Sequence, residues 1–242
     1  MKEKRILIKL SGEALQNTED NLIFDENVLF NICEQIKELV KDKYSVGIVV
    51  GGGNIWRGKL SNMLEISQES GDYMGMMATV INSLAISSIL SEKYHVKTNL
   101  INSLKVDIPE RYIEYNPSNV KDLFVPGEVN IFAGGTGKPF FSTDTSVVRK
   151  AISSNVSEIL IAKFGTDGVY DKDPNNHKDA KFISELTFDY AIKNNIAVMD
   201  EAAIKELSET DIVVKLFGMS EKNSILKSIN DNNFKMTIMK RK

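Results

Sequence analysis

Two lysines lie at the carboxyl ends of predicted strands of this sequence, at places suited to binding phosphate. Lys9 lies near the end of the apolar run Arg5–Leu10, and Lys163 follows the run Glu158–Ala162. A lysine in an apolar strand is usually an edge residue that keeps its ammonium in water. Here both lysines are followed by glycine-containing loops, and ammonium groups stabilise the charge on a phosphoryl group during transfer. The pattern therefore favours contact with one polyanionic ligand.

Glycine-rich loops follow two further predicted strands. They are the run Gly51–Gly53 and the loop holding Gly134, Gly135 and Gly137. A glycine loop lets backbone N–H groups approach a ligand, and three consecutive glycines exceed what a tight strand-to-helix turn needs. The second loop leads into a predicted helix with Thr143 or Asp144 as its N-cap, and a helix N-terminus attracts anions. Since parallel strands end at a common edge, we expect one anion site there.

Common nucleotide-binding and metal-binding templates do not fit. The run Gly53–Leu60 nearly matches G-x-x-x-x-G-K-[ST], but Leu60 replaces the hydroxyl residue that holds magnesium. The dinucleotide pattern G-x-G-x-x-G fails because Trp56 stands at its last glycine. An EF-hand beginning at Asp171 fails because Phe182 replaces the bidentate glutamate. Phosphate binding by another arrangement is the remaining interpretation.

Composition narrows the class of protein. The 242 residues allow one large α/β domain or two joined halves, at roughly 150 residues per domain. A net charge of −3 gives no broad footprint for nucleic acid. The single Cys33 suits a reduced, cytoplasmic setting, and neither His95 nor His177 has a partner at the spacing of a metal site or a catalytic triad. We expect no signal peptide, and no apolar stretch approaching the roughly 20 residues of a membrane span.

Alternating strand and helix signals predict a three-layer αβα sandwich with a central, mostly parallel sheet. A soft boundary near residue 155 would leave two halves sharing this sheet. The helix Gly75–Lys93 is apolar nearly all round, which places it in the core or between subunits. The other predicted helices are Glu26–Lys41, Asp144–Ser154, Phe188–Lys193, Glu201–Leu207 and Lys222–Asn230. The other predicted strands are Val46–Val50, Val96–Ile101, Val129–Ala133, Ile212–Phe217 and Lys235–Met239.

Six longer runs along the chain match a known pattern: KLSGEAL (Lys9–Leu15), VVGGGNIWRG (Val49–Gly58), DYMGMMATVIN (Asp72–Asn82), TGKPFFSTDT (Thr136–Thr145), DGVYDKDP (Asp167–Pro174) and VMD (Val198–Asp200). Through these runs the chain is similar, almost from end to end, to the amino-acid-kinase superfamily and, within it, to the bacterial-type UMP kinase family. The runs at Lys9–Leu15 and Val49–Gly58 occur in looser form across the superfamily, whereas Asp-Tyr-Met-Gly-Met and Pro-Phe-Phe-x-Thr-Asp-Thr are far more particular to UMP kinases.

The resemblance implies transfer of the γ-phosphoryl group of Mg-ATP to UMP, giving UDP and ADP, in de novo pyrimidine nucleotide (CTP) biosynthesis. It implies Mg²⁺ carried by the ATP phosphates without a direct protein ligand. It also implies a cytoplasmic homohexamer with GTP and UTP as effectors, and neither a membrane nor a nucleic-acid partner. The whole chain, 1–242, would be one domain. Its N-terminal half (about 1–155) would serve UMP and the oligomer contacts, and its C-terminal half (about 156–242) would serve ATP.

Matched residue by residue, the resemblance also assigns roles. Asp72 would hold the UMP ribose, Thr143 would lie close to the UMP phosphate, and Asp200 would orient the lysines. The catalytic residues would be Lys9, Lys163 and Asp200. The ATP-binding residues would be Lys9, Leu10, Ser11, Gly12, Gly53, Arg57, Phe164, Tyr170 and Asp173, with the last two at the adenine and ribose. The UMP-binding residues would be Gly52, Asp72, Thr136, Gly137, Lys138, Pro139, Phe140, Phe141, Ser142 and Thr143.

Departures from the family pattern limit what is carried over. Lys138 stands where asparagine is usual, and Phe164-Gly165 replaces a polar pair. The segments Asn17–Ile23 and Ser67–Gly71 lack residues that are frequent in the family, so regulation by GTP or UTP is not transferred. Two alternatives stay open: a related kinase of a carboxylate or carbamate, and a nucleotide sensor or nucleic-acid-binding regulator without catalysis. The pair Phe140-Phe141 suits a flat base better than a small acid.

Overall fold

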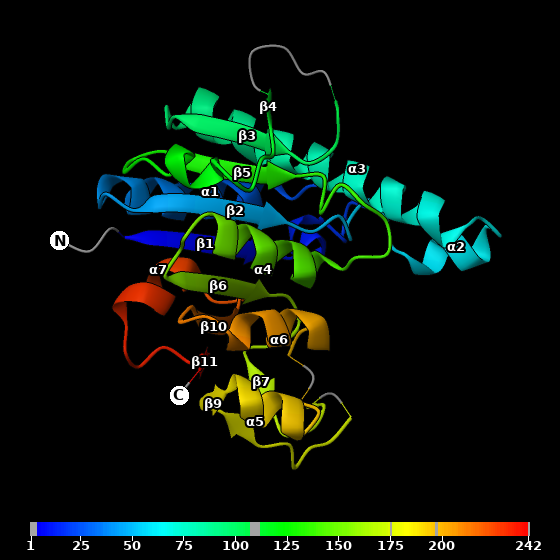
Figure 1. Cartoon of the computed structure of the whole chain (residues 1–242), viewed down its shortest axis with the longest axis vertical. Coiled ribbons are helices and arrows are strands. Elements are labelled where there is room, and N and C mark those ends of the chain that lie inside the picture. Colours follow the sequence, from blue (N-terminus) through cyan, green and yellow to red (C-terminus); the bar gives the residue numbers. More distant parts are fainter. Residues whose placement is uncertain (1–3, 107–111, 175, 197, 242) are drawn as a thin grey trace.

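The central sheet of the protein has nine strands in the part of the chain that the structure describes. The structure is a computed structural model and describes residues 4–106, 112–174, 176–196 and 198–241. Figure 1 shows the strands crossing the molecule one above another. From one edge of the sheet to the other they are β4 (Tyr112–Glu114), β3 (Thr98–Asn102), β5 (Val129–Ala133), β2 (Ser45–Val50), β1 (Arg5–Leu10), β6 (Glu158–Lys163), β10 (Val213–Gly218), β11 (Thr237–Lys240) and β9 (Glu185–Thr187).

The middle of this sheet is parallel. Strand β1 pairs in parallel with β2 and β6, and β2 pairs in parallel with β5. Among the described strand pairs of this sheet, only β10–β11 is antiparallel. The arrows of β2, β5 and β6 all end on the right in Figure 1. The four strands predicted to deliver lysines and glycine loops are therefore neighbours, β5-β2-β1-β6, and their carboxyl ends share one edge. A separate hairpin joins β7 (Val169–Tyr170) to β8 (Phe182–Ile183).

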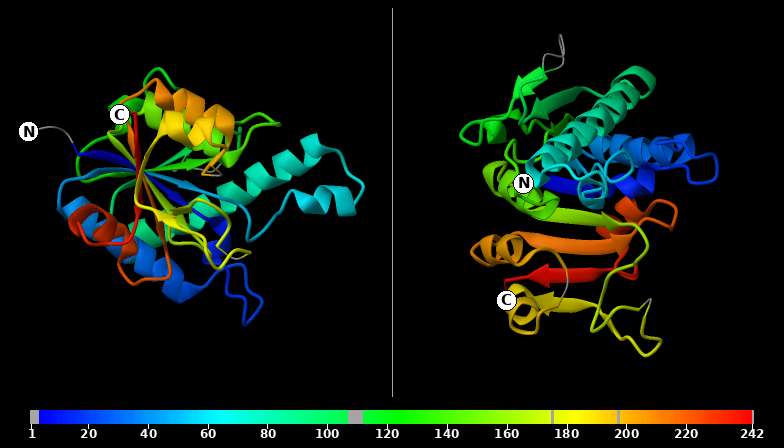
Figure 2. Two further views of the ribbon diagram at one scale, coloured as in Figure 1. Left: turned by 90° about the horizontal axis from the view of Figure 1, so that it is seen from below. Right: turned by 90° about the vertical axis from the view of Figure 1, so that its right-hand side faces the viewer.

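Helices cover both faces of the sheet, as the two views of Figure 2 show. One cluster of buried apolar residues lies between the sheet and helices α1, α3 and α7. A second cluster lies on the opposite face of the sheet, under α4, α5 and α6. This is the expected three-layer αβα sandwich. The helices are α1 (Glu26–Lys41), α2 (Lys59–Met63), α3 (Gln68–Ser88), α4 (Thr143–Ser153), α5 (Phe188–Lys193), α6 (Glu201–Ser208) and α7 (Ser224–Asn230), with 3₁₀ turns at Gly12–Leu15 and Val120–Leu123.

Strand alternation decides which way the two lysines point. In β1, Ile6 and Ile8 belong to the cluster under α1, α3 and α7, whereas Leu7 belongs to the cluster under α4, α5 and α6. Since successive side chains point to opposite faces, Lys9 lies on the α4 side with Leu7. In β6, Ile161 lies on that same side, and Lys163 follows it two residues later. Adjacent strands thus bring both lysines to one face.

The helix α3 begins earlier than the sequence predicted. Ser67 caps it by accepting a hydrogen bond from the Ser70 N–H at 3.1 Å, so Gly71 and Gly75 lie inside the helix. A π-helical turn, Ile89–Lys93, continues it. The most apolar window of Gln68–Lys93 has a mean hydropathy of 1.5, which is enough for a membrane span, so the expectation that no stretch reaches this length was wrong. Half of that window is buried in the fold, where α3 packs on β2, β3 and β5 as a core helix does.

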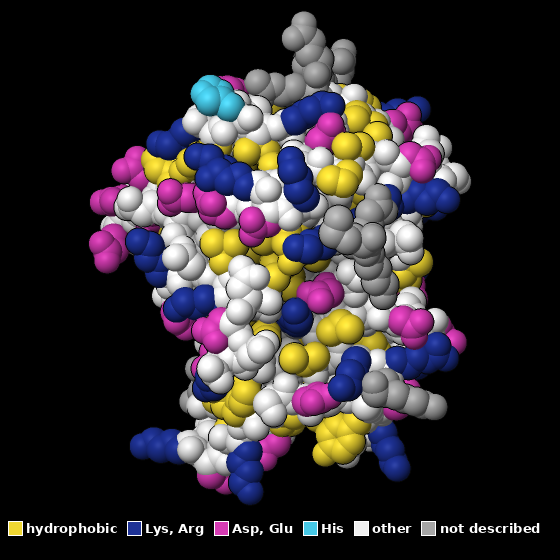
Figure 3. Space-filling view, turned by 90° about the vertical axis from the view of Figure 1, so that its left-hand side faces the viewer, with side chains coloured by type: hydrophobic (Ala, Val, Ile, Leu, Met, Phe, Trp, Pro, Cys, Tyr) yellow, Lys and Arg dark blue, Asp and Glu magenta, His cyan; other side chains and the backbone are white. Residues whose placement is uncertain are grey.

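The face at the amino ends of the parallel strands carries mixed charge. Figure 3 shows Lys and Arg side chains interleaved with Asp and Glu, without a continuous basic stripe across this face. A duplex or strand of nucleic acid needs a row of cations along its phosphates. The described side chains of this face therefore form no such row.

Candidate active site

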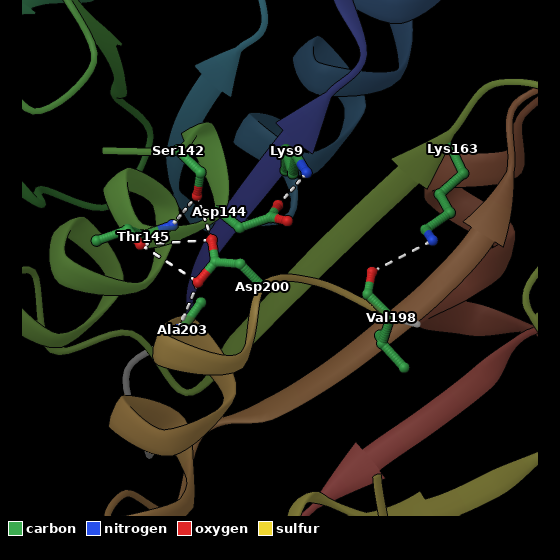
Figure 4. A network of polar contacts seen from close by, with 8 residues as sticks. All are labelled: Lys9, Ser142, Asp144, Thr145, Lys163, Val198, Asp200 and Ala203. Atoms are coloured by element: carbon green, nitrogen blue, oxygen red, sulfur yellow. Dashed lines mark hydrogen bonds and ion pairs between the residues drawn. The ribbon is translucent and has the colours of Figure 1, made fainter. Parts of the chain in front are cut away.

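An ion pair joins the first strand to the helix that follows the second glycine loop. The Lys9 ammonium donates a hydrogen bond to Oδ1 of Asp144 in the first turn of α4 (Figure 4). The two side chains are only 22% and 21% exposed, so water screens this pair less than it screens a surface pair. The pair fixes the Lys9 head group at the carboxyl edge of the sheet.

Lys163 completes a small cluster of charges at this edge. Its Nζ lies 3.4 Å from the carbonyl oxygen of Val198, to which it donates. Burial holds the pKa of Lys163 below its ordinary value, nearby Lys9 lowers that pKa further, and Asp144 opposes the shift. Lys9 pairs with Asp144, and Lys163 lies near enough for both charges to act on it, which leaves an excess of positive charge in a partly buried place. Such a place favours a ligand rich in anionic oxygens.

Asp200 ties together the N-termini of two helices. As N-cap of α6 it accepts from the Ala203 N–H at 2.8 Å, and it also accepts from the hydroxyls of Ser142 and Thr145 (Figure 4). Ser142 is in turn the N-cap of α4, because its Oγ accepts from the Thr145 N–H at 3.1 Å. The prediction of Thr143 or Asp144 as N-cap was wrong by one or two positions. Both positive helix ends therefore point toward the site.

At this site the carboxylate that pairs with Lys9 is Asp144, which sequence analysis considered only as a possible N-cap. The described contacts of Asp200 are to Ser142, Thr145 and the α6 backbone. The role expected for Asp200, orienting the two lysines, stays a prediction.

The glycines after β1 and β2 pack directly against one another. A Cβ on Gly12 would lie 2.4 Å from the carbonyl oxygen of Gly51, and a Cβ on Gly52 would lie 2.9 Å from that of Gly75 in α3. The ends of β1 and β2 and the helix α3 can approach one another this closely only because these positions are glycines without side chains. Close packing is thus a sufficient reason for these two glycines, besides any approach to a ligand.

Arg57 closes the outer side of the same glycine loop. Its Nε donates to the carbonyl oxygen of Gly53 at 3.1 Å, and its guanidinium lies 3.4 Å from Glu13. The Leu10 side chain is fully buried, and its carbonyl oxygen accepts from the Gly51 N–H at 3.0 Å. The ATP contact expected for Leu10 stays a prediction.

The loop 134–142, which we call the acceptor loop, runs from β5 to α4 past the start of α3. The Phe140 N–H donates to Oδ2 of Asp72 at 2.7 Å, although the two residues are 68 positions apart. Phe140 has a φ of +66° and, like Phe141, an exposed ring. The Thr136 hydroxyl accepts from the Lys138 N–H and donates to its carbonyl oxygen. The expected UMP residues Asp72 and Thr136–Thr143 thus lie along one continuous rim.

A cavity of about 860 Å³ opens on the other side of Lys163. Of the expected ATP residues, Phe164 and Tyr170 line it, together with the expected catalytic residue Lys163. The other expected ATP residues are not part of this lining: Lys9, Leu10, Ser11, Gly12, Gly53, Arg57 and Asp173. Asp173 accepts from Nδ2 of Asn176 at 2.6 Å in the neighbouring loop. Sequence reasoning missed the α1 side of this cavity, where the lining residues are Ala14, Asn27, Val28, Asn31, Ile32 and Gln35.

Tyr170 is held on the cavity wall by two charged neighbours. Its hydroxyl donates to Oδ1 of Asp167 at 2.7 Å, and Lys235 lies 2.6 Å from the same carboxylate. Burial acts to raise the pKa of Asp167, but the hydrogen bonds from Lys235 and Tyr170 bring it below its ordinary value. Asp167 is therefore ionised at neutral pH and fixes the tyrosine ring.

The carboxylates at the site are compatible with a magnesium ion that is bound mainly by the phosphate oxygens of a ligand. No group of three His, Cys, Asp or Glu residues forms a metal site within the described ranges. Asp144 and Asp200 lie at the site, each already engaged with the groups described above. Mg²⁺ usually keeps several waters and binds one or two carboxylates plus substrate phosphates. The residues present fit that mode of binding.

Comparison with known proteins identifies the family. The sequence model of the amino acid kinase family matches residues 4–218. The chain belongs to the amino acid kinase family. Uridylate kinase of Mycoplasma capricolum subsp. capricolum is 39% identical over 238 residues, which cover 98% of each chain. Uridylate kinase of Mycoplasmopsis pulmonis is 43% identical over 228 residues, which cover 93% of this chain and 92% of that one.

Solved structures of this amino acid kinase family share the whole fold. A crystal structure of UMP kinase from Ureaplasma parvum aligns with a TM-score of 0.89 at 36% identity, covering 99% of this chain and 100% of that one. UMP kinase from Bacillus anthracis aligns with a TM-score of 0.89 at 32% identity, covering 98% and 96%. The resemblance predicted from the sequence is confirmed. As a member of this family, the protein is an enzyme that transfers phosphoryl groups.

Proposed function

We propose that this amino acid kinase family member phosphorylates UMP with Mg-ATP, giving UDP and ADP. The observation that carries the proposal is the cluster of Lys9, Asp144 and Lys163 at the strand ends, between the acceptor loop and the cavity beside Tyr170. Relatives named uridylate kinase over nearly the full length support UMP as the acceptor. The rim of Asp72 and Thr136–Thr143 would bind UMP, and the cavity would receive the ATP nucleoside.

The chemistry needs little beyond charge compensation and alignment. An oxygen of the UMP phosphate attacks the γ-phosphorus of ATP, a new P–O bond forms, and the bond to the β-phosphate oxygen breaks to release ADP. The second pKa of a phosphate monoester is about 6, so the attacking oxygen is already ionised at pH 7 and no general base is required. Lys9 and Lys163 would stabilise charge on the transferred group, while the N-termini of α4 and α6 add positive potential.

Mg²⁺ is part of this proposal. Bound to the triphosphate, it would neutralise charge on the β- and γ-phosphate oxygens. Phosphate oxygens and water would hold it, and Asp144 and Asp200 are the described carboxylates of this chain at the site.

Self-association is proposed from α3. Its exposed apolar side chains fall on one stripe, Tyr73, Met74, Met77 and Ile81, while the opposite side packs on the sheet. An apolar stripe in contact with water is typical of a subunit contact. A homohexamer that works in the cytoplasm, in pyrimidine nucleotide synthesis, is the assembly and setting we propose. GTP and UTP remain candidate effectors.

An acceptor panel tests the reaction. Purified protein with Mg-ATP is offered UMP, CMP, dCMP and aspartate, and nucleoside diphosphate or acyl phosphate is measured by chromatography. We expect a marked preference for UMP. Turnover of aspartate, or equal rates with all nucleotides, would contradict the proposal and favour a different acceptor within the family. Binding of ATP and UMP without turnover would favour a nucleotide sensor. Light scattering on the same sample measures the mass of the assembly.

A further inference from the structure

A lysine that neither the reaction nor the family resemblance uses lies entirely inside the protein. Lys150, on the inner side of α4, is 2% exposed. Its ammonium donates to the carbonyl oxygen of Gly135, to Oγ of Ser146 at 3.0 Å and to Oγ of Ser103 at 3.4 Å. Lysine is almost never fully buried unless it is paired, yet no carboxylate contacts this one in the described part of the chain. Its position therefore calls for a specific reason.

Aromatic rings and polar oxygens replace the missing carboxylate. The Lys150 Nζ lies 4.9 Å from the ring centroid of Tyr115 and 5.7 Å from that of Phe132, within the range of cation–π attraction. Tyr115 is the titratable group that faces it, and burial raises the pKa of that phenol. Arg149, the next residue of α4, points outward to Glu206. The ammonium is thus held by neutral acceptors and ring faces alone.

All these contacts meet beneath the start of the acceptor loop. The Gly135 carbonyl oxygen accepts from Lys150 and also from the Ser103 hydroxyl at 3.0 Å. A Cβ on Gly137 would lie 2.6 Å from the carbonyl oxygen of Ser103, so the loop rests directly on the segment after β3. Lys150 therefore links α4, the end of β3 and the acceptor loop from below.

We propose that Lys150 is a positioning residue for the acceptor, because its buried ammonium fixes the Gly135 carbonyl and so sets where residues 136–143 hold the acceptor nucleotide. This rests on the proposed function in one respect, namely that the acceptor bound by this rim is UMP. Lys150 lies under the loop and does not itself contact the substrate.

The ammonium is also close to losing its proton at neutral pH. Burial lowers the pKa of Lys150 to about 7. The protonated form gives a charge-assisted hydrogen bond to Gly135, whereas a neutral amine gives a weaker one. The acceptor loop should therefore be held more firmly below pH 7 than above it.

Steady-state kinetics of Lys150→Met test the proposal. We expect the KM for UMP to rise about tenfold or more, as for the loss of a buried charge-assisted hydrogen bond, while the KM for ATP changes less than about twofold. Lys150→Arg keeps the charge and should restore most of the KM for UMP. In the native enzyme that KM should rise from pH 6.5 to 8.5, and in Lys150→Arg it should not. The matched control is Lys215→Met, which removes a lysine whose side chain is 14% exposed in its ion pair with Glu158.

A second measurement does not depend on activity. Amide hydrogen exchange of residues 134–142, without nucleotides, should be faster in Lys150→Met than in the native protein, and unchanged in Lys215→Met. Ser103→Ala, which removes the other donor to Gly135, should change exchange in the same direction and provides the test if Lys150→Met does not fold. Unchanged exchange in this loop, an equal rise of both KM values, or no restoration by Lys150→Arg would overturn the proposal. A native enzyme that exchanges as expected but does not phosphorylate UMP would instead refute the proposed function.

Discussion

Lys9 in β1 and Asp144 in α4 form an ion pair across 135 positions of the chain. The pair joins the carboxyl end of β1, just before Gly12, to the first turn of α4, which follows the acceptor loop. Because Lys163 lies on the same face of the sheet, Asp144 balances one of two positive charges. Asp144 therefore governs where the Lys9 ammonium lies and how much net charge the site presents.

The variant Asp144→Asn tests both effects, because the position of Lys9 should influence kcat and the net charge should influence the KM for ATP. The variant keeps the shape of the side chain but removes the charge that holds Lys9, so we expect kcat to fall by about 10- to 100-fold. The KM for ATP should stay the same or fall, because the site becomes more positive. Initial-rate kinetics at several ATP concentrations measure both. Glu201→Gln, which removes a carboxylate from the exposed pair with Lys205 on α6, is the control and should leave both constants unchanged.

Lys9→Met should nearly abolish turnover without unfolding the protein. Loss of an ammonium that faces the transferred group costs about 10²-fold or more in kcat. The Lys9 head group is not part of the apolar core, so the thermal midpoint should move by only a few degrees. Coupled-assay rates and a thermal melt followed by circular dichroism give both quantities. A variant with kcat within threefold of the native value would remove Lys9 from the reaction.

Asp72→Ala tests the rim on the acceptor side. The Asp72 carboxylate accepts from the Phe140 N–H at 2.7 Å, and family resemblance assigns it to the ribose of UMP. Removing it should raise the KM for UMP by about tenfold and leave the KM for ATP nearly unchanged, since a charge-assisted hydrogen bond is worth about 1.5–3 kcal/mol. Asp72→Asn should show a smaller increase. An unchanged KM for UMP would exclude Asp72 from acceptor binding.

Much of the fold could be predicted because the chain marks its elements locally. The predicted strand Val129–Ala133 and the predicted helices Glu26–Lys41 and Phe188–Lys193 have the bounds seen in the structure. Each is an apolar run of the right period between clear breaks or caps. The hairpin β7–β8 and the strand β9 were missed, because two or three residues are too few to show any period.

The location of the site could be predicted from the sequence, but the ion-pair and hydrogen-bond partners of its residues could not. Strand ends and glycine loops follow from local sequence, and the sheet order brings them together. Ser142, Thr143 and Asp144 are all good cap formers, so no local signal selects Ser142. The partner of Lys9 depends on tertiary contact alone. From the sequence alone Lys150 would be taken for a surface lysine. Its apolar neighbours Val147 and Ala151 nevertheless lie on the buried side of α4.

The burial of Lys150 also predicts how stability depends on pH. Its pKa is lowered from 10.5 to about 7 in the folded protein, so between these values the unfolded chain binds a proton that the folded one has released. Stability from this group therefore rises with pH through that range, by at most about 1.4 kcal/mol per pH unit. Below pH 7 the lysine is charged in both states, and burying it carries its full cost.

Urea unfolding of the native protein and of Lys150→Met at pH 7, 8 and 9 measures this effect. Groups common to both proteins, such as Lys163, cancel in the difference between the two free energies of unfolding. We expect the native protein to gain stability relative to the variant at each step in pH. A difference that does not change from pH 7 to pH 9 would mean that Lys150 keeps its proton in the folded state, and the pH dependence expected for the acceptor loop would then be wrong as well.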